Sequence, residues 1–127
     1  MRTIMVVIAA VALAACSKSG SDKSATPRDK VLEAWKAGKI EPTAMAAAQV
    51  AVGKDCQSGR VEAIDVLICN FASPAEAKAA EDAGLAWVGQ ATGASQARGP
   101  ALVVVADRKK SDPNGRLINS LLKLAPP

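Results

Sequence analysis

The stretch AIDVLICNF at positions 63–71 decides the fold expected for this 127-residue chain. Alternate residues of a β-strand face opposite sides, and here both sides are almost wholly apolar. A strand that is apolar on both faces is typical of the centre of a sheet. A second run, ALVVVA at 101–106, has the same character. The sequence therefore predicts two buried strands in the core of one domain.

Helix start and stop signals surround these strands. Thr26-Pro27 combines an N-cap with proline at the first helical position, and Gly38 follows as a stop. Ser73 and Glu76 form a capping-box pattern at the start of another helix. The predicted helices span residues 27–37, 42–52, 74–83 and 113–124, and a weaker strand spans residues 85–91.

These elements predict an α+β domain over residues 27–127, with the element order ααβαββα. We expect two layers, with helices packed on a small three-stranded mixed sheet. Residues 55–60 read as a loop, and residues 61–91 as a right-handed βαβ crossover. The small-residue stretch 92–99 is expected to be the loop that closes a hairpin.

The N-terminal residues have the pattern of an export signal. A basic start, Met1-Arg2, precedes the ten-residue apolar run IMVVIAAVAL at 4–13, and small residues follow. A helix of ten residues spans about 15 Å, half of the ~30 Å hydrocarbon core of a bilayer. The run is therefore too short for a stable transmembrane helix.

The residues Leu13-Ala14-Ala15-Cys16 resemble the bacterial lipobox, the processing motif of bacterial lipoproteins. The resemblance implies that residues 1–15 are removed as a signal peptide and that the Cys16 thiol carries lipid, with fatty acyl chains such as palmitate. It also implies attachment to a membrane, and Ser17 after the cysteine resembles the outer-membrane default of Gram-negative bacteria, facing the periplasm. The alternative is an ordinary secretory signal cut after Ala14 or Ala15, which leaves Cys16 as a free thiol.

Residues 16–26 then form the lipidated cysteine and a polar, flexible tether. The domain that follows resembles the small lipoproteins of unknown activity that are common in bacterial genomes, a resemblance that implies no activity of its own.

Cys56 and Cys69 are expected to form a disulfide, because an exported protein folds in an oxidising compartment. The bond requires the strand predicted at 63–71 to begin near Ile64, with residues 57–62 folding back towards it. Two unpaired thiols are the alternative. A metal site is not expected, because two cysteines without histidine do not make a zinc site.

The composition argues against an enzyme and against a cofactor. The chain has no histidine, the commonest general base. Ser120 and Lys123 match the S-x-x-K nucleophile motif, yet the companion motifs of those enzymes are missing. Glu76, Glu81 and Asp82 are expected on a solvated helix face. The formal net charge of +4 is too small and too dispersed for nucleic-acid binding.

A basic stretch at 107–116 is the candidate ligand site. Arg108, Lys109, Lys110 and Arg116 lie between a predicted strand and a helix N-terminus, where backbone N–H groups favour anions. A solvated loop is the alternative interpretation. The sequence thus predicts a membrane-anchored, non-enzymatic lipoprotein that binds an envelope protein or an anionic envelope polymer. A small-ligand or anion-binding module that uses this loop is the second hypothesis.

Overall fold

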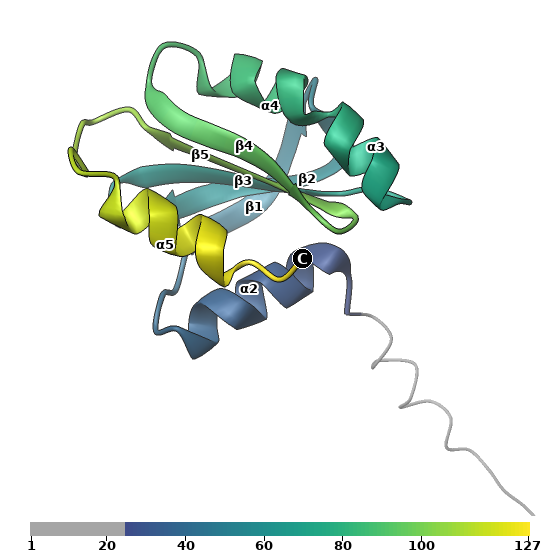
Figure 1. Ribbon diagram of the computed structural model, residues 1–127, viewed down its shortest axis with the longest axis horizontal. Coiled ribbons are helices and arrows are strands. Elements are labelled where there is room, and N and C mark those ends of the chain that lie inside the picture. The colour runs from purple at the N-terminus through teal and green to yellow at the C-terminus, as the bar shows by residue number, and fades with distance from the viewer. Residues whose placement is uncertain (1–24) are drawn as a thin grey trace, which may run out of the picture.

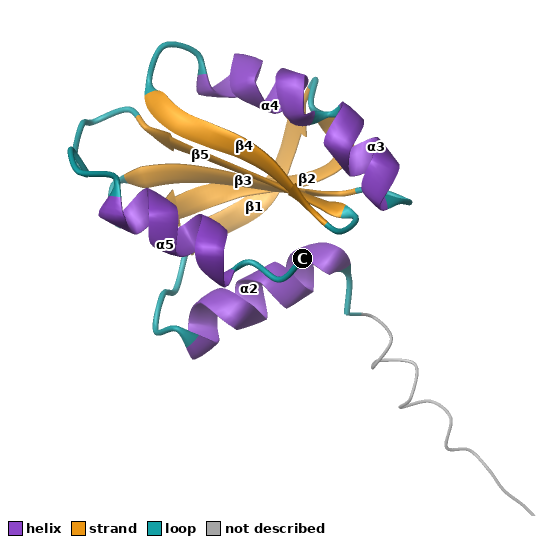
Figure 2. Ribbon diagram, viewed as in Figure 1, coloured by secondary structure: helices purple, strands orange, loops and turns teal. Residues whose placement is uncertain are grey.

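A five-stranded antiparallel sheet forms the middle of the domain (Figures 1 and 2). The computed structural model describes residues 25–127. Along the sheet the strands run in the order β1-β2-β3-β5-β4, and every neighbouring pair is antiparallel. The strands are β1 (Thr43–Val50), β2 (Gly53–Val61), β3 (Ile64–Asn70), β4 (Thr92–Arg98) and β5 (Ala101–Asp107).

Helices cover both faces of this sheet, so the described domain has three layers (Figure 1). One face packs against α2 (Pro27–Ala37) and α5 (Arg116–Leu124), and the other packs against α3 (Pro74–Ala79) and α4 (Glu81–Val88). Each face has its own apolar core, and the two central strands, β3 and β5, contribute alternate residues to both. The predicted strands at 63–71 and 101–106 are confirmed as this buried centre.

The fold class predicted from the sequence is wrong. The sheet has five antiparallel strands in place of three mixed ones, and the element order differs from ααβαββα. Residues 42–52, expected to be helical, contain β1, and residues 85–91, expected to be a strand, lie mostly in α4. The expected loops at 55–60 and 92–99 are parts of β2 and β4. Residues 61–91 contain β3, α3 and α4 but no second strand parallel to β3, so they do not form the predicted βαβ crossover.

Strand pairing explains these differences. Alanine favours helices, but that intrinsic preference is small and tertiary contacts override it. The alanine-rich β1 forms a strand because it pairs with β2 through a two-residue turn at Ala51 and Val52. β2 is polar because no helix packs closely on much of it, and a polar strand leaves little apolar pattern to detect.

Candidate functional site

The predicted lipid attachment residue, Cys16, lies outside the described residues, as do the predicted signal peptide and most of the tether. The described chain begins just before α2 (Figure 1). The sites described below therefore belong to the domain alone.

The predicted disulfide is present between Cys56 of β2 and Cys69 of β3. These residues face each other directly in the strand register, with their Cα atoms 4.0 Å apart. β3 begins at Ile64, as the bond requires, and residues 57–61 return as a paired strand rather than as a loop. Both cysteines are buried, so the bond joins two neighbouring strands inside the core.

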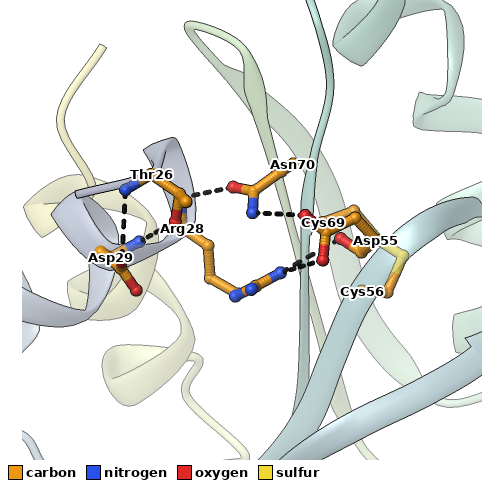
Figure 3. Close-up of polar contacts among 7 residues, drawn as sticks. All are labelled: Thr26, Arg28, Asp29, Asp55, Cys56, Cys69 and Asn70. Atoms are coloured by element: carbon orange, nitrogen blue, oxygen red, sulfur yellow. Dashed lines mark hydrogen bonds and ion pairs between the residues drawn. A yellow bond between two sulfur atoms is a disulfide. The ribbon is translucent and has the colours of Figure 1, made fainter. Parts of the chain in front are cut away.

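A polar cluster beside the disulfide fixes the start of α2 (Figure 3). Asp55 and Asn70 are the next pair in the register after the two cysteines. The Arg28 side chain donates from Nη1 to Oδ1 of Asp55 at 3.0 Å and to its carbonyl oxygen at 3.1 Å. Asn70 Nδ2 donates to Asp55 Oδ2 at 2.9 Å, and the Arg28 backbone N–H donates to Asn70 Oδ1 at 2.7 Å. The first turn of α2 is thus joined to both disulfide-linked strands.

The same cluster shifts the titration of Asp55. The hydrogen bond from Asn70, followed by that from Arg28, holds the pKa of the Asp55 carboxyl below its usual value of 3.8. The helix also has a complete capping box, in which Thr26 Oγ1 accepts from the Asp29 N–H and Asp29 Oδ2 accepts from the Thr26 N–H. The N-cap predicted at Thr26 is therefore confirmed.

The predicted basic residues at 108–116 are not brought together into one anion site. The Arg108 guanidinium donates to the carbonyl oxygens of Val88 and Trp87 at the end of α4, at 3.1 and 3.0 Å. It lies over the Trp87 ring, 4.7 Å from the ring centroid, a cation–π contact. Arg108 is therefore engaged within the domain, whereas Lys109, Lys110 and Arg116 are exposed.

Two acidic side chains organise this loop from inside. Asp107 accepts from Ser111 N–H, Ser111 Oγ and Asp112 N–H at 2.8 to 3.0 Å. Burial opposes ionisation of Asp107, but these hydrogen bonds outweigh it and lower the pKa of the carboxyl. Asp112 in turn accepts the Ile118 N–H in the first turn of α5 at 2.9 Å. One amide at this helix N-terminus is thus already bound to a carboxylate of the chain itself, and α5 begins at Arg116 rather than at Pro113.

A second polar group lies beside the start of β1. Asp65 of β3 accepts from Arg60 Nε at 3.3 Å and from Arg108 Nε at 3.0 Å. Arg60 and Asp65 adjoin a hollow of about 470 Å³. The hollow is lined by Thr43, Ala44, Ser58, Gly59, Arg60, Asp65 and Trp87. Its half-exposed Arg60 guanidinium is a group that can bind a carboxylate, and it is already paired on one side with Asp65.

Trp35 and the two S-x-x-K residues form no site: Trp35 lies in the core, and the other two lie on the surface of a helix. Trp35 is fully buried and donates from Nε1 to the Leu121 carbonyl oxygen at 2.8 Å, as expected of a core residue. Ser120 and Lys123 are exposed on α5. Residues 25–127 hold no group of three or more acidic, cysteine or histidine side chains placed to bind a metal ion. Within the same residues, no helix has the length and apolar character needed to cross a bilayer.

No family model, curated protein or solved structure matches the chain. The candidate sites therefore rest on their own geometry.

Two groups of residues were not predicted from the sequence: the cluster of Arg28, Asp55 and Asn70, and the hollow at Arg60 and Trp87. A signal for the first was present, since Asp55 and Asn70 each stand next to a cysteine that was expected to pair. The second group joins three strands and α4, and only the true sheet order brings these residues together.

Proposed function

We propose that the protein is a lipoprotein of the bacterial cell envelope, anchored to a membrane through lipid on Cys16, and that its domain is a non-enzymatic binding domain. The observation that carries the proposal is the sequence Leu13-Ala14-Ala15-Cys16 at the end of a short apolar run. The disulfide supports export, because such bonds persist in oxidising compartments.

A role in binding, rather than in catalysis, is supported by how the acidic side chains are used. Glu81 accepts the Ala97 N–H at 2.8 Å, and Asp107 and Asp112 accept backbone N–H groups of their own loop. These three carboxylates are hydrogen-bonded to backbone N–H groups and hold strand and loop backbone in place. Anchoring at Cys16 would then hold the domain close to the membrane, within reach of other envelope proteins.

The test is metabolic labelling of bacteria that express the full chain, using a fatty acid with a clickable alkyne. We expect label on the protein and an intact mass that matches lipidated Cys16 at the N-terminus, and we expect neither for Cys16→Ser. An unlabelled protein cut after Ala14 or Ala15 would overturn the anchor. Turnover of an envelope substrate by the purified protein would overturn the non-enzymatic role.

A further inference from the structure

β1 is an edge of the sheet that is protected at its two ends by register irregularities but not along its centre. Proteins protect edges with charged side chains, prolines, β-bulges or a covering helix. β1 reads TAMAAAQV, which has neither a charge nor a proline, and the helices pack mainly on β3, β4 and β5. Its backbone groups are therefore accessible to another strand.

The register of the sheet identifies the outward-facing backbone groups. Cys56 and Cys69 have the close Cα spacing of a non-hydrogen-bonded pair, so Cys56 directs its N–H and C=O towards β1. Ala48 of β1 is opposite Cys56, and Ala47 is opposite the next residue of β2. Ala47 therefore directs its N–H and C=O away from the sheet.

Pairing along this edge would be short. The β1 register is irregular between Thr43 and Ala46 and again between Ala48 and Val50. Only the central residues can continue a regular ladder, so an added strand needs side-chain contacts as well. The hollow lined by Arg60 and Trp87 supplies such a contact at the start of β1.

Arg60 has donor groups available for a carboxylate. Its Nε is paired with Asp65, whereas its two terminal nitrogens have no hydrogen-bond partner among residues 25–127. Asp65 is itself fixed by Arg108, which is bound to two carbonyl oxygens of α4. A side chain oriented in advance loses less freedom on binding. The fork of an arginine matches the two oxygens of a carboxylate.

We infer that the outer edge of β1 binds an extended segment of another envelope protein, as a sixth strand, and that an acidic side chain of this segment binds Arg60. This mode of recognition combines main-chain hydrogen bonds for affinity with side-chain contacts for specificity. The inference rests on the proposed function of an interaction domain, and it adds the binding surface and the chemistry of the partner.

The charges favour a different protein over a second copy of this chain. Because Ala47 directs its backbone groups outward, two β1 strands can pair with Ala47 opposite Ala47, which places Thr43 of one copy opposite Ala51 of the other. Residues 43–51 have no acidic side chain, so the β1 strand of a second copy brings no carboxylate to Arg60.

The experiment uses the full chain, purified from bacterial membranes into phosphatidylethanolamine–phosphatidylglycerol nanodiscs. A displayed library of random octapeptides is selected on these discs and on empty discs. We expect the selected peptides to carry an acidic residue, and replacing it by its amide should weaken binding about tenfold, the equivalent of one charged hydrogen bond. The Arg60→Gln variant should lose this difference, and the matched control Lys54→Gln should keep it.

Hydrogen exchange then locates the selected peptide. We expect slower exchange in residues 43–50, and we expect Ala47→Pro to abolish it, since proline removes an outward donor and leaves the bonds to β2 intact. Four results would overturn the inference: no selection above empty discs, no acidic preference, an acidic preference that survives in Arg60→Gln, or protection at residues 107–116 instead. Protection of β1 that rises with protein concentration, without peptide, would assign the edge to a second copy. The intact mass reports lipidation separately, so a failed anchor is distinguishable from a failed docking site.

Discussion

The two edges of the sheet, β1 and β4, are built differently. β4 keeps a regular register with β5 over its whole length, α4 packs across it, and Glu81 binds the outward N–H of Ala97. β1 has no close helix, no charge and an irregular register, and it is supported from behind by the disulfide between β2 and β3. The chain itself covers the β4 edge, whereas the β1 edge lies beside two disulfide-linked strands and is left accessible.

The largest effect on this contrast is expected from removal of the disulfide. The variant Cys56→Ala/Cys69→Ala should lose about 3 kcal/mol of unfolding free energy, the value typical of a closed loop of this size. Urea denaturation measures the loss. Hydrogen exchange should quicken more in β1 and β2 than in β4, and an equal change at both edges would contradict the support assigned to the bond.

A smaller effect is expected where α4 meets β4. A Cβ on Gly84 would collide with Ser95 Oγ and lie 2.9 Å from Val104 Cγ2. Gly84→Ala should therefore destabilise the protein by about 1–2 kcal/mol, because the steric strain exceeds the gain in helix propensity. Thermal unfolding measures it. Ala86→Ser, at an exposed position of the same helix, should stay within about 0.5 kcal/mol.

The variant Glu81→Gln weakens the protection of the β4 edge, with a smaller expected loss of stability than Gly84→Ala. Loss of the charged hydrogen bond to the Ala97 N–H should cost about 1 kcal/mol and speed exchange of that amide. Asp82→Asn is the matched control, since Asp82 is exposed in the same helical turn. Similar exchange at Ala97 in both variants would show that the Glu81 contact does not protect the edge.

The smallest effect, at the start of α2, depends on pH. The folded-state pKa of Asp55 is lowered, so its charge stabilises the fold above its unfolded pKa, and this stabilisation is lost as pH falls through the folded value. At pH 7, Asp55→Asn should cost less than about 1 kcal/mol, because the side chain is 60% exposed. The difference from the native protein should shrink below pH 3.8. A constant difference in urea denaturation across this range would contradict the ion pair.

The sequence was most informative where burial dictates residue type. β3 and β5 are apolar on both faces, and α2 carries a complete cap, so these three elements were predictable. The disulfide was also predictable, from the resemblance of the N-terminal residues to an export signal and from the condition at Ile64.

The two edge strands and β2 were not predictable in the same way. β1 is rich in alanine, β2 is polar and β4 consists mostly of small residues, because none of the three is buried on both faces. Local composition therefore indicated a helix and two loops, and strand pairing overrode it. The Arg60–Asp65–Arg108 group was missed for the same reason, since it exists only once β3 lies between β2 and β5.

The Cys56–Cys69 bond also limits how far the chain can be stretched. The bond spans 13 residues, which stay closed off when the rest of the chain is pulled out. In a single-molecule pull between its two ends, the oxidised chain should therefore lengthen by about 40 Å less than the reduced chain, at about 3.5 Å per residue and with the Cα atoms of the bonded pair 4.0 Å apart. An unfolded, oxidised domain held by its N-terminal side thus reaches less far from its attachment point than a reduced one.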